Sequence, residues 1–131
     1  MNHIIARITK IESVDNLNLV TFDFHGRALK MMSLDLREDI QVAKEVLLTI
    51  RPTHLMVAKK LSGKLSISNN IPVKVISIED GKLLSSVKVT CNDIILESIM
   101  IVESIAHMEL KVSDDVRIMI PESELSIVKV L

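Results

Sequence analysis

The chain has 131 residues, a formal net charge of −1 and 48% hydrophobic residues, with two Phe and neither Trp nor Tyr. Aliphatic side chains must therefore build the core of a folded chain, and intrinsic disorder is excluded. The apolar runs are too short to span a membrane, and the single cysteine, Cys91, fits a reducing compartment, so we expect a soluble cytoplasmic protein with no membrane partner.

Alternating apolar and polar residues predict β-strands along most of the chain. β-Branched residues are frequent, and turn signals such as HG, NN and DG recur every eight to twelve residues or so, as in a small barrel. In chain order, the clearest alternating segments are HIIARITKI (3–11), LLTI (47–50), VKVISI (73–78) and SVKVTC (86–91).

Two segments are predicted to be short helices, namely SLDLREDI (33–40) and SIAHMEL (104–110). Each begins with a serine, Ser33 or Ser104, that could cap the first turn. Between them, the polar segment KKLSGKLSISNN (59–70) is predicted to be a linker.

An internal repeat divides the chain into two similar halves. ITKIESVDNLNLV (8–20) aligns with VISIEDGKLLSSV (75–87) at an offset of 67, from Ile11 to Ile78. EVLLTIRPTHLMV (45–57) aligns with DVRIMIPESELSI (115–127) at an offset of 70. The increase predicts small loop insertions in the second copy, and a period this long indicates tandem domains, not a solenoid.

We expect one domain at residues 1–61 and a second at 62–131. Domains of about 65 residues bury a modest fraction of their surface, so the copies should pack together and the chain should form homo-oligomers. Charge is uneven: residues 1–65 carry 10 Lys and Arg against 7 Asp and Glu, whereas residues 66–131 carry 6 against 10. The first half is therefore the better host for an anion.

The repeat resembles a tandem pair of molybdate-binding Mop domains, which are related to TOBE domains. The segments that carry this resemblance are VAKEV (42–46) and IRPTHLMVA (50–58) in the first copy, with SIAHMELKVSDDV (104–116) and IPESELSIV (120–128) in the second. The resemblance covers almost the whole chain and implies an all-β fold with short helices, built as two OB-like small β-barrels. By analogy with tandem relatives, it also implies a homotrimer.

The resemblance implies that the ligand is a tetrahedral oxyanion, molybdate or tungstate. An anion without a proton offers only acceptors, so a matching site presents hydroxyl, amide and cationic donors. Carried over by motif, the oxyanion-binding candidates are Lys30, Ser33, Arg51, Thr53, Ser66, Ser68, Asn69, Ser104 and Ser123. We expect the strongest site to combine Arg51, Thr53 and Ser33 with Ser66 and Asn69 of the same or a neighbouring chain, with Lys30 as a second cation.

The second copy departs from the family pattern. Pro121 stands where the first copy has Arg51, and Ser68 stands where the family has an arginine. The second copy alone should therefore bind an anion poorly. Six of the candidates also have a structural interpretation: Arg51 as a turn residue, Ser33 and Ser104 as helix caps, and Ser66, Ser68 and Asn69 as linker residues.

Catalytic motifs are missing from the sequence. It contains no phosphate-binding loop, nucleophile elbow or dinucleotide fingerprint, and its four histidines have no metal-ligand spacing, so we expect neither an enzyme nor a metal site. The leading hypothesis is oxyanion storage, homeostasis or sensing. The alternatives are a structural TOBE module without a ligand and an OB-like nucleic-acid-binding domain, although the lack of stacking aromatics and the net negative charge argue against the latter.

Overall fold

The computed structural model describes residues 1–131 and contains ten strands, one α-helix and two short 3₁₀ helices. The first repeat consists of β1 (Asn2–Val14), β2 (Leu17–Phe24), β3 (Arg27–Leu34), β4 (Glu45–Ile50), η1 (Pro52–His54) and β5 (Met56–Ala58). The second consists of β6 (Asn69–Asp80), β7 (Leu84–Cys91), β8 (Ile94–Ile101), α1 (Val102–Met108), β9 (Asp115–Ile120), η2 (Glu122–Glu124) and β10 (Ser126–Val130). The predicted all-β class is confirmed.

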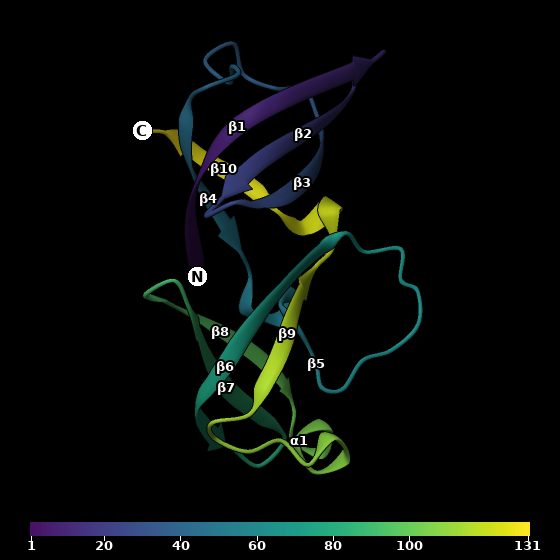
Figure 1. Ribbon diagram of the computed structural model, residues 1–131, viewed down its shortest axis with the longest axis vertical. Coiled ribbons are helices and arrows are strands. Elements are labelled where there is room, and N and C mark those ends of the chain that lie inside the picture. The colour runs from purple at the N-terminus through teal and green to yellow at the C-terminus, as the bar shows by residue number, and fades with distance from the viewer.

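The two five-stranded sheets exchange their last strands. One sheet has the order β10-β4-β1-β2-β3 and the other has the order β5-β9-β6-β7-β8, with every pairing antiparallel. Figure 1 shows the two sheets stacked along the long axis, with β10 crossing into the half that holds β1–β4. A division at residues 61 and 62 therefore separates the two repeats in sequence but not the two sheets.

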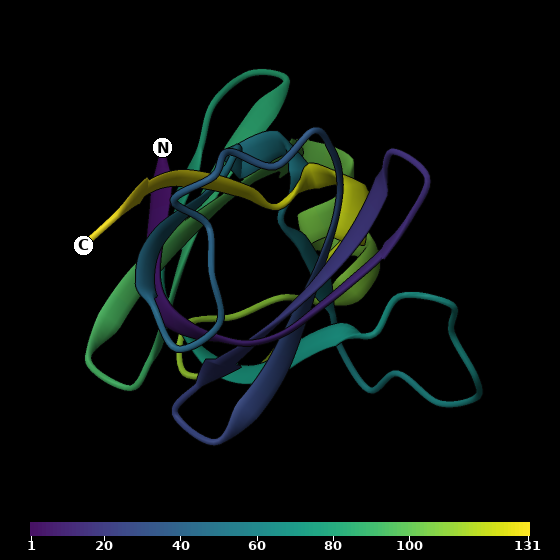
Figure 2. The same ribbon diagram turned by 90° about the horizontal axis from the view of Figure 1, so that it is seen from above.

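Each sheet curls into an OB-like barrel, and the view from above shows the strands winding around a central region (Figure 2). A bulge helps the first strand of each sheet to bend: the register of β1 shifts between Ile8 and Lys10, and that of β6 between Val75 and Ser77. The two bulges are 67 residues apart, as the repeat requires.

Alternation along the strands places the aliphatic residues inside. In β1 the side chains of Asn2, Ile4, Ala6 and Ile8 are buried, whereas the residues between them are exposed. A single cluster of 24 buried hydrophobic residues includes side chains from both sheets. Leu55 and Leu125 lie on the segments that cross between the sheets, and both belong to this cluster. The strand exchange therefore contributes side chains to the core.

The predicted helix at 33–40 is wrong. Ser33 is the partner of Asn18 in the ladder between β2 and β3, and Asp35 follows with a left-handed φ of 54°. The residues between β3 and β4 are 35–44, whereas those between β8 and β9 are 102–114, which is three more. Those three residues account for the change of offset from 67 to 70 and provide room for α1 in the second repeat only.

The second predicted helix exists but begins two residues earlier than expected. Ile101 is the N-cap of α1, so Ser104 lies within the helix and does not cap it.

The predicted linker is irregular from residue 59 to residue 68, after which β6 begins. In both ribbon views the linker loops away from the sheets (Figures 1 and 2). None of the helices has the length and apolar character needed to cross a bilayer.

Candidate functional site

Two seams form where a 3₁₀ helix leaves one sheet and packs against the other. In the first seam, η1 contacts β8 near α1; in the second, η2 contacts β3 and the loop at 35–40. Both 3₁₀ helices close through the same hydrogen bond, from His54 N–H to the Arg51 carbonyl and from Glu124 N–H to the Pro121 carbonyl. The seams are thus related by the internal repeat, and each one brings both repeats together.

A buried asparagine fixes each seam. The Asn2 side chain accepts a hydrogen bond from Glu97 N–H and donates one to the Glu97 carbonyl, both at 2.7 Å. Asn69 makes the same pair with Lys30, at 2.6 and 2.7 Å, and also donates to the Ile120 carbonyl at 3.0 Å. Both N–H groups of the Asn69 amide are therefore used within the chain, and none remains to bind an anion.

The first-seam pocket has a volume of about 370 Å³. The polar side chains that line it are Thr53 from η1, Ser98 from β8, and Ser104 and His107 from α1. The Ser98 hydroxyl is buried and donates to the Leu55 carbonyl at 2.5 Å, which connects β8 to the segment after η1. Because no carboxylate lines this pocket, its polar wall consists of hydroxyls and an imidazole.

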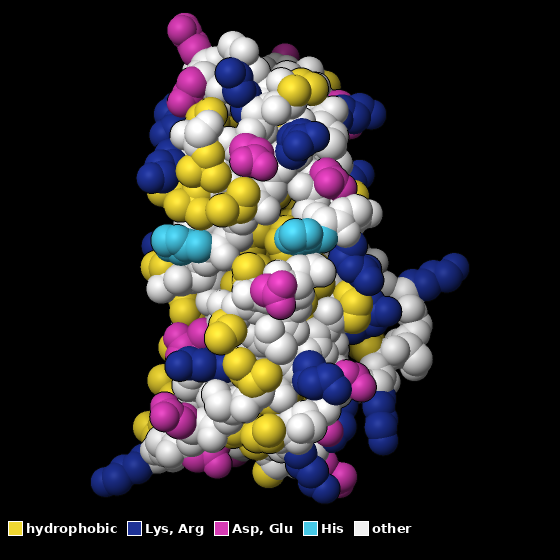
Figure 3. Space-filling view, turned by 60° about the vertical axis from the view of Figure 1, so that its left-hand side comes forward, with side chains coloured by type: hydrophobic (Ala, Val, Ile, Leu, Met, Phe, Trp, Pro, Cys, Tyr) yellow, Lys and Arg dark blue, Asp and Glu magenta, His cyan; other side chains and the backbone are white.

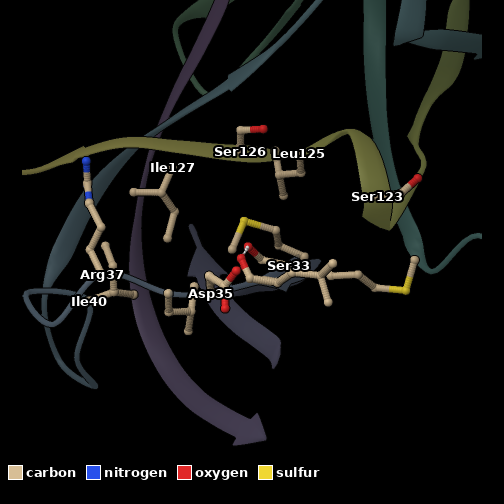
Figure 4. A pocket seen from close by; sticks show the side chains of 12 residues that line it. Ser33, Asp35, Arg37, Ile40, Ser123, Leu125, Ser126 and Ile127 are labelled. Atoms are coloured by element: carbon tan, nitrogen blue, oxygen red, sulfur yellow. Dashed lines mark hydrogen bonds between the residues drawn. The ribbon is translucent and has the colours of Figure 1, made fainter. Parts of the chain in front are cut away.

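The second-seam pocket has a volume of about 450 Å³ and a different polar lining. Figure 4 shows Ser33 and Asp35 on the β3 side and Ser126 on the β10 side, with Ser123 on η2. Arg37 also lines this pocket, where its guanidinium lies 3.4 Å from the Asp39 carboxylate. This pocket therefore combines hydroxyls and one cation with an anionic side chain.

An ion pair joins the two 3₁₀ helices. The His54 imidazole Nδ1 lies 3.1 Å from a Glu124 carboxylate oxygen, and the pair is charged on both sides only when the imidazole is protonated. His54 and Glu124 are 70 residues apart and occupy equivalent places in the two repeats. Their contact therefore places η1 and η2 next to each other, with Thr53 and Ser123 one residue before each partner.

The structure brings the predicted site residues together in two pairs. Thr53 and Ser104 both line the first-seam pocket, and Ser33 and Ser123 both line the second-seam pocket, so Ser33 and Thr53 do not share a pocket within one chain. The remaining candidates line neither seam pocket: Arg51, Ser66 and Ser68 are exposed, Lys30 is half-buried, and Asn69 is fully buried.

Sequence reasoning missed several pocket residues. Ser98 is a buried serine in a β-strand, and a small polar residue in such a strand is the signal that could have identified it. Asp35, Arg37 and Ser126 fall in segments whose structure depends on the missing helix and on the strand exchange, which the residue pattern does not reveal. His107 was considered only as a metal ligand, and no group of three His, Cys, Asp or Glu side chains is placed to hold a metal ion.

Two ionisable groups outside the seams have displaced pKa values. A hydrogen bond from the Lys59 ammonium lowers the pKa of Asp114, and a second from Lys111 N–H lowers it further. The Lys59 nitrogen lies 2.9 Å from the Asp114 carboxylate, which ties the end of β5 to the loop before β9. Burial raises the pKa of the Cys91 thiol, against a smaller opposing effect of Arg27. Neither group reaches the seam pockets.

Comparison with solved structures finds a close match to the cytoplasmic molybdate-binding protein ModG in a form with molybdate bound. The TM-score is 0.89, and the alignment covers 96% of this chain and 94% of that chain at 19% sequence identity. The chain has the ModG fold. By contrast, no protein-family model matches the sequence, and a search of curated proteins finds no match.

The match to ModG extends over nearly the full length of both chains, so it spans both sheets. It confirms the resemblance to tandem Mop domains at the level of the fold. ModG is a binding protein, and it is cytoplasmic.

Proposed function

We propose that this chain binds a tetrahedral oxyanion, molybdate or tungstate, in the cytoplasm. The observation that carries the proposal is the first-seam pocket, where Thr53 and Ser104 from different repeats face one cavity that has no carboxylate. The pocket belongs to a backbone shared with a protein whose structure contains molybdate. A role in storage, homeostasis or sensing fits such a binding protein.

The chemistry of the first-seam pocket suits an anion that carries no proton. Such an anion accepts hydrogen bonds and donates none, so hydroxyl donors without a competing carboxylate are favourable partners. Hydrogen phosphate carries a proton for which a carboxylate would be the strongest acceptor, and no carboxylate lines this pocket. Separation from sulfate must rest on the size of the cavity.

We further propose a homotrimer in which Arg51 contributes at an interface between chains. The Arg51 side chain is exposed and forms no ion pair within the chain, and it lies outside both seam pockets. A second chain could bring its guanidinium to a bound anion, where a charge-assisted hydrogen bond would form. Lys30, Ser66 and Ser68 remain candidates for the same kind of contact.

The two alternatives receive less support. A structural module without a ligand would not require hydroxyls from two repeats to share a pocket. A nucleic-acid-binding module would require a basic surface, whereas the face in Figure 3 shows Lys and Arg interspersed with Asp and Glu and no continuous basic band.

Native mass spectrometry and calorimetry would test the proposal on the intact protein, with molybdate and tungstate as ligands and sulfate and phosphate as controls. We expect uptake of molybdate or tungstate at micromolar or lower concentration and at a fixed ratio to protein. No uptake of any of the four anions would refute the function. Arg51→Ala should weaken binding by about 1.5–3 kcal/mol if its guanidinium contacts the anion, and should leave it unchanged if Arg51 is only a turn residue.

A further inference from the structure

The two seam pockets are related by the repeat but differ in charge. Asp35 lines the second-seam pocket, whereas no Asp or Glu lines the first. We propose that Asp35 excludes a fully deprotonated oxyanion from the second seam, so that each chain binds its ligand at the first seam only. This inference rests on the proposed function and assigns Asp35 as the residue that determines which pocket is used.

The donors of the second-seam pocket are partly occupied within the chain. The Ser33 hydroxyl donates to the Leu34 carbonyl at 3.1 Å, and the Arg37 guanidinium is 3.4 Å from Asp39. Asp35 forms no ion pair, and the one cation that lines this pocket, Arg37, is paired with Asp39 instead. A dianion in this pocket would face a like charge, and the carboxylate would offer an acceptor to a ligand that has no proton to donate.

The first-seam pocket has the opposite balance. Ser98 donates to a backbone carbonyl, but the hydroxyls of Thr53 and Ser104 have no hydrogen-bond partner within the chain. His107 provides a further ring nitrogen that can donate. An oxyanion in this pocket would meet free donors and no carboxylate.

The difference follows from the three-residue change between the repeats. In the second repeat, the longer connection forms α1 and places Ser104 and His107 along the first seam. In the first repeat, the shorter connection turns at Asp35, with a φ of 54°, and brings a carboxylate to the second seam. The same length change that removes a helix therefore also places a carboxylate in one pocket and none in the other.

Native mass spectrometry of the full chain with added molybdate would test the inference through the number of anions bound per chain. Asp35→Asn removes the charge and keeps the backbone, because Asn tolerates a positive φ as Asp does. Glu38→Gln is the matched control, since it removes one charge from an exposed residue of the same loop that does not line the pocket. Ser104→Asp places a carboxylate in the first-seam pocket.

We expect one anion per chain for the unmodified protein and for Glu38→Gln, two for Asp35→Asn, and none for Ser104→Asp. Two anions per chain in the unmodified protein, or no gain for Asp35→Asn when its thermal unfolding is unchanged, would overturn the role of Asp35. An absence of binding in all four proteins would instead overturn the proposed function itself. Circular dichroism would confirm that each variant is folded.

Discussion

The side-chain amide of Asn69 pairs with both backbone groups of Lys30, accepting from its N–H at 2.6 Å and donating to its carbonyl at 2.7 Å. These bonds connect the start of β6 in one sheet to β3 in the other. Asn69→Ala should lower the free energy of unfolding by about 2–4 kcal/mol, because each buried polar group left without a partner costs about 1–3 kcal/mol. Urea denaturation followed by circular dichroism would measure the loss.

The neighbouring residue provides the control for this prediction. The Asn70 amide oxygen accepts a bond from the Arg117 guanidinium at an exposed site, so Asn70→Ala should change the stability by roughly 0.5 kcal/mol or less. Equal effects of the two substitutions would show that the buried hydrogen bonds to Lys30 add no more stability than the exposed bond of Asn70.

The exchange of β5 and β10 predicts that the two repeats depend on each other. Separate fragments 1–61 and 62–131 should each fold poorly alone, because each carries a strand that belongs to the other sheet. Mixing them should restore a folded one-to-one complex, which circular dichroism and native mass spectrometry would detect. Two fragments that each gave a stable monomer would show that the exchange is not needed for folding.

Removing a hydroxyl from the first seam should weaken oxyanion binding. We expect Thr53→Val and Ser104→Ala each to reduce the affinity for molybdate by roughly 10- to 100-fold, because a hydrogen bond to a charged group contributes about 1.5–3 kcal/mol. Ser123→Ala removes a hydroxyl from the other seam and should leave the affinity unchanged. Calorimetry would measure all three, and equal losses would contradict the use of the first seam alone.

The ion pair between Lys59 and Asp114 predicts a pH-dependent contribution to stability. Because the pKa of Asp114 is lowered in the folded chain, its contribution is complete above the unfolded value of about 3.9 and is lost as the pH falls through the folded value. Asp114→Asn should therefore lower the Tm at pH 7, and the difference from the unmodified chain should shrink toward zero near pH 2.

Thermal unfolding by circular dichroism across this pH range would measure the effect. Asp115→Asn is the matched control, since the Asp115 side chain is 85% exposed and lies 3.4 Å from the Lys74 nitrogen. A surface pair of this kind contributes little. A constant Tm difference for Asp114→Asn from pH 7 to pH 2 would contradict the assignment.

The sequence predicted the strands well because their burial alternates with a period of two. Ile4, Ala6 and Ile8 point into the core at alternate positions, as their pattern indicated. The change of offset also predicted an insertion in the second copy, and the structure has three extra residues between β8 and β9. The residues at 33–40 alone could not rule out the predicted helix. The helix is absent because Ser33 belongs to the ladder between β2 and β3 and because the connection to β4 is short.

The residue pattern could not predict the strand exchange. MVA (56–58) and SIVKV (126–130) could each pair with a strand of their own repeat or of the other, and the choice depends on the direction in which η1 and η2 direct the chain. The pocket assignments depend on the same choice. The hydroxyls at Thr53 and Ser123 were identified, but the partner of each could be found only in three dimensions.

The exchanged strand β10 also sets the order in which the chain can fold during synthesis. β10 pairs with β4 through Ser126 and Thr49, which are 77 residues apart in sequence (126 − 49). The sheet that contains β1 to β4 is thus completed by β10, which is made only after β6 to β9. The edge of β4 that pairs with β10 therefore stays unpaired until the second repeat has been synthesised. Such late, long-range pairing slows folding.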